Sequence, residues 1–180
     1  MSASYIPPSS SSSIVDRMRR AAMLDASLYE EVEHDRSATG QAAVVVALSA
    51  VASAIGLAFR GGPGLISGVV GTVVGWAVWS GITFLIGTRL FHGRATWSEV
   101  LRTLGFAQAP GVLMALAIIP LLGGPIAFIV GLWVAVAGFV ALRQALDIDA
   151  MKTFFTVLIG MVALVLVRGL IGRLVGIPVY

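Results

Sequence analysis

The sequence predicts an all-α membrane protein with five transmembrane helices, a cytoplasmic N-terminus and a short amphipathic helix before the first span. Of the 180 residues, 58% are hydrophobic and 12% are charged, whereas soluble domains usually carry about a quarter charged residues. Five apolar runs follow one another after residue 41. Backbone groups in lipid must be satisfied internally, which favours helices for these runs.

The first 40 residues form the only sizeable polar segment. Residues 1–13 are rich in Ser and Pro, which predicts a disordered tail. Residues 14–40 are expected to hold one cytoplasmic amphipathic helix, because apolar residues recur there at roughly helical spacing. Arginines come before acidic residues along this segment, an order that opposes the helix dipole. The helix is therefore expected to rest on a membrane surface or a partner; a solvated helix with a weak apolar face is an equal alternative.

Residues 41–180 contain the five predicted spans. Each run is close to the roughly 17–25 residues that a helix needs to cross a bilayer. The runs are 42–59, 65–90, 106–122, 126–146 and about 153–175. The connections between the first two runs, and between the third and fourth, are very short, which predicts two antiparallel helical hairpins.

The distribution of positive charge predicts the orientation. With the N-terminus inside, nine Lys and Arg residues lie on the inner side of the spans and Arg60, Arg168 and Arg173 lie on the outer side. This bias places the N-terminus in the cytoplasm. Because the positive excess borders the apolar runs, we expect membrane lipids and other integral membrane proteins, or self-association, as partners, and no nucleic acid. The predicted location is a membrane crossed several times, the cytoplasmic membrane if the cell is prokaryotic.

No catalytic, metal or cofactor site is predicted. The chain has no cysteine, which excludes disulfides and thiolate chemistry. His34 and His92 are the only histidines, and neither belongs to a close set of ligands. We find no nucleophile with an acid–base partner, so the protein is predicted not to be an enzyme.

Two features of the spans predict contacts in the membrane. Gly68, Gly71 and Gly75 in the second run allow another helix to approach closely. A helix of the same chain is the favoured partner, with a dimer interface as the alternative. Arg168 and Arg173 in the fifth run are expected to reach the outer headgroups and contact lipid there.

Three stretches carry a family resemblance: "LYEEVEHDRSATGQA" (28–42), "TWSEVLRTLGFAQAPGVL" (96–113) and "GLWVAVAGFVALRQALDID" (131–149). In these, the chain resembles the Yip family, membrane proteins that interact with Ypt/Rab GTPases, and more closely its prokaryotic members. The resemblance implies five packed helices, a cytosolic N-terminus and no enzyme activity. Binding of a GTPase is not carried over, because the short N-terminal tail gives no evidence for it.

The second and third of these stretches predict a polar cluster at the inner membrane face. Residues 96–104 are expected to form a short amphipathic helix on that face, with Thr96 or Ser98 as its N-cap. The cluster would contain Arg102, Arg143, Gln144 and Asp147, with Arg143 and Asp147 paired across one helical turn. Its predicted uses are orientation and docking.

These observations predict a non-enzymatic integral membrane scaffold or interaction protein of the Yip type, with an accessory subunit of a larger membrane complex as one form of it. A small transporter or channel is the alternative, although the spans offer few polar residues for a path: Ser49, Ser53, Ser80, Thr83 and Gln108. A cofactor-binding subunit with His34 or His92 as ligand ranks third.

Overall fold

A computed structural model describes residues 13–58 and 64–175, with side chains through residue 166. This part of the chain is helical and contains no strand, as the composition predicts. The elements are α1 (Ile14–Ala22), α2 (Ala26–His34), α3 (Ala38–Leu57), α4 (Leu65–Phe91), α5 (Trp97–Phe106), the 3₁₀ helix η2 (Ala109–Ile118), α6 (Gly123–Leu146) and α7 (Ala150–Val175). The tail predicted to be disordered lies, except for Ser13, outside the described residues.

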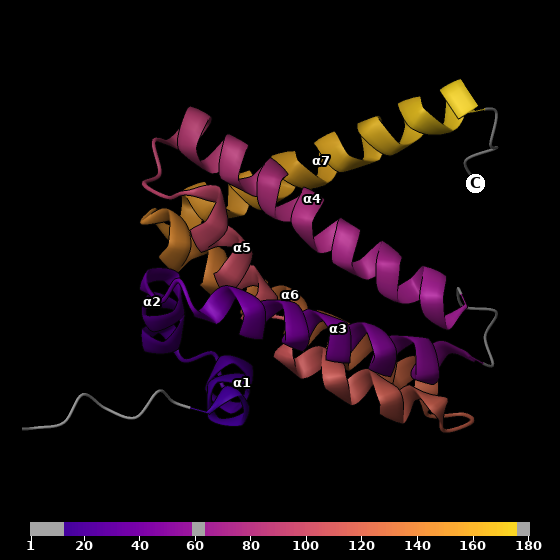
Figure 1. The fold of residues 1–180 in the computed structure, drawn as a ribbon. Coiled ribbons are helices and arrows are strands. Elements are labelled where there is room, and N and C mark those ends of the chain that lie inside the picture. The colour runs from indigo at the N-terminus through magenta and orange to yellow at the C-terminus, as the bar shows by residue number, and fades with distance from the viewer. Residues whose placement is uncertain (1–12, 59–63, 176–180) are drawn as a thin grey trace, which may run out of the picture.

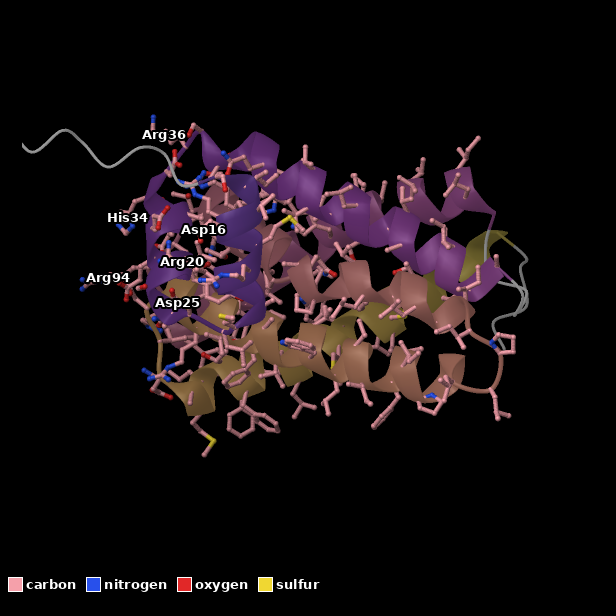
Figure 2. The ribbon with its side chains drawn as sticks, turned by 90° about the horizontal axis from the view of Figure 1, so that it is seen from below. Asp16, Arg20, Asp25, His34, Arg36 and Arg94 are labelled. Atoms are coloured by element: carbon pink, nitrogen blue, oxygen red, sulfur yellow. The ribbon has the colours of Figure 1, made fainter. Side chains whose placement is uncertain are left out.

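The long helices run side by side and alternate in direction (Figure 1). α3, α5 and α7 begin at one end of the bundle, and α4 and α6 finish there. We call this end, together with α1 and α2, the polar end. The charged side chains labelled in Figure 2 gather at this end. The end of α3, the start of α4 and the connection from η2 to α6 lie at the opposite end.

The number of identifiable spans is lower than the five predicted. Among the described residues, α3, α4 and α6 are long and apolar enough to cross a membrane. The pair α5 and η2 makes a fourth only if it is counted as one span bent by 41°. α7 runs from Ala150 to Val175; its described side chains, Ala150–Leu166, form an apolar segment, and the remaining ones lie outside the described residues.

The amphipathic segment before the first span is two helices rather than the single helix predicted. Leu24 has a φ of 61° and ends the first helical path. Asp25 then starts α2, because its side chain accepts a hydrogen bond from the backbone N–H of Ser27. The chain reverses direction between α1 and α2. The charge order that is unfavourable in one long helix is thereby divided between two segments of opposite charge, which face each other.

The segment 96–104 enters the bundle, whereas it was predicted to lie on the membrane face. Thr96 is its N-cap, as one of the two predicted choices, and forms a capping box with Glu99. From Arg102 onward the residues of α5 are buried. Gly105 permits this, since a Cβ there would lie 2.7 Å from the Cβ of Ala42 on α3.

The third span is bent between α5 and η2, in the stretch from Gly105 to Pro110. Pro110 has no N–H to donate and cannot continue an α-helical ladder. The chain proceeds from Ala109 as a 3₁₀ helix, with Gly111 against α3: a Cβ at this position would lie 2.1 Å from the Oγ of Ser49. Gln108 lies at this break and is half-buried.

Candidate interaction site at the polar end

An ionic network joins α1 to α2 and to the start of α3. The Nε of Arg17 donates to Glu31 Oε1 at 3.1 Å, its Nη2 to Asp35 Oδ2 at 2.8 Å and its Nη1 to Gln41 Oε1 at 3.0 Å. Arg20 Nη1 donates to Glu31 Oε2 at 2.6 Å. The Arg17 side chain is only 5% exposed. Since hydrogen bonds between charged groups are about twice as strong as neutral ones, the network fixes the hairpin.

Asp25, which pairs with Arg20, and Asp35 are stabilised in their ionised form. The hydroxyl of Ser27 and the guanidinium of Arg20 lower the pKa of Asp25. The hydroxyl of Ser37 likewise lowers the pKa of Asp35. Hydrogen bonds that favour the carboxylate have this effect, so these two side chains stay ionised throughout the neutral pH range.

Arg102 fastens the C-terminal end of α2 to α5. Its Nε donates to the carbonyl of Val32 at 3.0 Å, and its Nη2 donates to the carbonyl of Glu33. Carbonyls in the last turn of a helix have no partner within the helix, and a cation there also suits the helix dipole. Arg102 is 3% exposed, so it is an internal clamp rather than a docking group.

Glu33 is a buried carboxyl beside this clamp. It is 7% exposed, and burial raises its pKa to about 7. His34 opposes the shift, while the charges of Asp147, Glu99 and Glu30 add to it. The polar end therefore contains a group that changes charge near neutral pH.

The four residues of the predicted cluster surround α2 without forming one cluster. Gln144 donates to Oε1 of Glu30 at 3.4 Å, and Arg102 binds the α2 carbonyls. Arg143 and Asp147 are exposed, and no ion pair joins them within the described residues. Asp147 has a φ of 51° and ends α6, so the helical spacing needed for that pair is lost.

The predicted packing glycines lie on an open face of α4. Gly71 and Gly75 are exposed, Gly68 is half-buried, and a Cβ built at Gly71 or Gly75 meets nothing within 4 Å. The favoured contact with a helix of the same chain is therefore not formed in the described structure. The side chains of Arg168 and Arg173 lie outside the described residues.

The histidines and the span hydroxyls have ordinary structural surroundings. Nδ1 of His34 lies 2.9 Å from the carbonyl of Glu30, and His92 is the exposed C-cap of α4. Among the described residues no three acidic or histidine side chains form a group that could hold a metal. Ser80 and Thr83 donate to carbonyls one turn earlier in α4, at 2.8 Å each, so neither is free to line a polar path.

Sequence reasoning missed the network of Arg17 and Arg20. Its signals were present in the charge order of residues 14–37 and in "LDAS", where an aspartate precedes Ser27 at a helix start. It also missed that Arg102 is internal, because the carbonyls that it binds lie some 70 residues away in the chain.

Long apolar helices with a charged cover at one end define an integral membrane protein with several spans. The chain matches the Yip1 domain over residues 26–171 and belongs to that family. The match starts at α2 and confirms the resemblance read from the sequence, while membership in the prokaryotic type stays a prediction. No curated protein and no solved structure matches the chain significantly.

Proposed function

We propose that the protein is a non-enzymatic membrane scaffold, an accessory subunit that binds another integral membrane protein or a second copy through α4. One observation carries the proposal: the glycine-bearing face of α4 is open. In the most apolar stretch of each span, the share of residues that are buried is 11% in α4, 39% in α3 and 22% in α6. α4 is thus the described span with the most surface left for a partner.

The shape of this face suits close helix packing. Val74 and Val78 follow Gly71 on the same side of α4 and are 54% and 45% exposed. In lipid, helices associate by close van der Waals contact, for which small residues let the backbones approach. A groove at Gly71 and Gly75 between valine ridges provides that contact.

Substitution at Gly71 tests the scaffold. Gly71→Leu fills the groove without a clash inside the chain, since a Cβ there meets nothing within 4 Å. Gly131→Leu on α6 is the matched control, because Gly131 is exposed and equally free of neighbours. After cross-linking in membranes and purification in mild detergent, a partner identified by mass spectrometry should fall at least fivefold with Gly71→Leu and stay with Gly131→Leu. Equal recovery with both variants contradicts the proposal.

The second part of the proposal is five crossings with the polar end in the cytoplasm. The alternation of helix directions and the positive residues at the polar end support it, including the exposed Arg89, Arg94 and Arg143. The chain has no cysteine, so single cysteines report their side of the membrane.

Ala26→Cys marks the polar end and Leu121→Cys, at a 95% exposed residue, marks the other end. In intact cells a membrane-impermeant maleimide should label Leu121→Cys and a cysteine added after Tyr180, but not Ala26→Cys. Labelling of Ala26→Cys from outside reverses the orientation. Protection of the added cysteine reduces the number of crossings to four.

A further inference from the structure

An apolar cavity lies between α4, α5, α6 and α7. Its volume is about 410 Å³, within the roughly 300–1,000 Å³ typical of small-molecule sites. Its wall includes the indoles of Trp76 and Trp79 from α4, Leu104 and Gln108 from the third span, and Gly138 from α6. Met161 on α7 closes one side.

Three local features create this space. The third span bends by 41° between α5 and η2, and Leu104, Ala107 and Gln108 at this bend line the space. Gly138 leaves the α6 wall without a side chain: a Cβ there has as its nearest neighbour Leu104 Cδ2 at 3.9 Å. α7 crosses α4 near Gly160, where a Cβ would lie 3.2 Å from the Trp79 ring, and the two helices then diverge (Figure 1).

One polar group of the wall is left to a ligand. The Trp76 indole N–H donates to the carbonyl of Leu101 at 3.0 Å, and Thr72, which also lines the wall, donates to the carbonyl of Gly68 at 2.8 Å. The Gln108 side chain has no hydrogen-bond partner among the described residues, although it can donate and accept. An unpaired amide within a membrane is costly, which favours a bound partner.

The wall also limits the ligand. None of the described side chains that line the cavity is charged, so these side chains offer an ionised headgroup no counter-charge. Gln108 is 12 residues beyond Thr96, roughly 18 Å into the bundle at the helical rise. A phospholipid headgroup at the bilayer surface does not reach that depth.

We infer that this cavity binds an uncharged lipid-like molecule, with its long apolar body along the Trp76, Trp79 and α7 wall and a hydroxyl or carbonyl group hydrogen-bonded to the Gln108 amide. The cavity shares Gly75 with the glycine face through which the scaffold function is proposed, but its test at Gln108 and Gly138 does not depend on that function. Binding would give the protein a lipid-dependent state.

The test uses two matched photoreactive probes on the full chain in phosphatidylcholine nanodiscs. One is an octadecanol that carries a diazirine and an alkyne, and the other is the same molecule without the hydroxyl. Mass spectrometry maps the labelled peptides. Gly138→Leu fills the cavity from a position with space for a side chain, and Gly131→Leu is its control at an exposed position two turns earlier in the same helix, outside the cavity wall.

In the unsubstituted protein the alcohol should label segments 104–108 and 134–142 about fivefold more than the hydrocarbon does. Gly138→Leu should reduce labelling by both probes at least fivefold, and Gly131→Leu should leave it unchanged. Gln108→Leu should abolish the stronger labelling by the alcohol. This ratio between the two probes is measured within one protein, so it does not depend on the protein yield.

Three outcomes would overturn the inference. One is labelling spread evenly over the lipid-facing helices. Another is equal labelling of Gly138→Leu and Gly131→Leu. The third is labelling that falls as protein concentration in the membrane rises, which would show that a second copy fills the cavity.

Discussion

The polar end and the α4–α7 side of this protein are held together by different forces. At the polar end, Arg17 and Arg102 are almost fully buried and donate to named acceptors in α2 and α3. On the α4–α7 side, exposed valines and glycines face outward, and α7 leaves α4 after a single crossing.

This contrast shows where the fold is specified and where it is open to partners. Charge-assisted hydrogen bonds are directional and leave unpaired groups when one member is lost. Apolar contacts in lipid are non-directional, and lipid tails replace a missing helix at little cost in free energy. Substitutions should therefore lower the stability of the fold strongly at the polar end and only slightly on the α4–α7 side.

Loss of Arg17 should have the largest effect. Arg17→Ala removes the cation between Glu31 and Asp35, whose side chains are 35% and 27% exposed. Breaking a buried ion pair costs about 3–5 kcal/mol, and this partial exposure places the expected loss near about 3 kcal/mol. Hydrogen–deuterium exchange of residues 14–34 should rise throughout. The exposed Arg19→Ala is the control, and protection that survives in Arg17→Ala would mean that apolar contacts hold the hairpin.

Loss of Arg102 should rank second. Arg102→Ala leaves the carbonyls of Val32 and Glu33 without their donor, and hydrogen bonds to charged groups contribute about 1.5–3 kcal/mol. We expect exchange to increase in α2 while α1 and α3 keep more of their protection. Arg143→Ala should change stability by less than about 0.5 kcal/mol, because Arg143 is exposed. Similar effects of both substitutions would place the two arginines in one cluster after all.

The difference between these two arginines also explains what sequence reasoning could reach. Composition, periodicity and the family resemblance predicted an all-helical membrane protein, and the Yip1 domain match confirms the family. The sequence predicted Thr96 or Ser98 as the N-cap of this helix, and the capping box of Thr96 with Glu99 shows that it is Thr96.

Features that depend on distant contacts were not predictable in this way. "SEVLRTLGF" has the amphipathic pattern of a surface helix, and only the packing of Gly105 against Ala42 on α3 makes it internal. A hydrophobic pattern shows that a face is covered, but whether lipid or protein covers it is decided by tertiary structure. For the same reason, the sequence could not show whether Arg102 lies inside the protein or at its surface.

The pH dependence of α2 packing sharpens the contrast further. Burial raises the pKa of Glu33 to about 7, so its neutral form is preferred in the folded state. The stabilisation is complete below the ordinary carboxyl pKa of about 4.3 and is lost as the pH rises through about 7. Asp25 and Asp35 have lowered pKa values, so their contributions are lost only in acid and do not change between pH 5 and pH 8.

Glu33→Gln should therefore stabilise α2 by about 1 kcal/mol at pH 8, allowing for solvent screening, and have little effect at pH 5. The measurement is hydrogen–deuterium exchange of residues 26–34 at both pH values, corrected for the intrinsic exchange rate. His34→Gln is the control, because the pKa of the exposed His34 is also raised, by its hydrogen bond with the Glu30 carbonyl and by the charge of Glu33. A pH dependence that persists in Glu33→Gln and disappears in His34→Gln would assign it to the histidine.

The smallest effect is expected on the open face of α4. Val78→Ala removes two methyl groups from a side chain that is 45% exposed, and such surface substitutions usually change stability by less than about 0.5 kcal/mol. Thermal unfolding of the purified protein in nanodiscs should show no shift for the isolated chain. If Val78→Ala lowers stability by about 1 kcal/mol or more in native membranes only, a partner packs against this face there. A loss of that size in nanodiscs holding one chain each would instead show that α4 packs within its own chain, and the contrast between the two regions would fail.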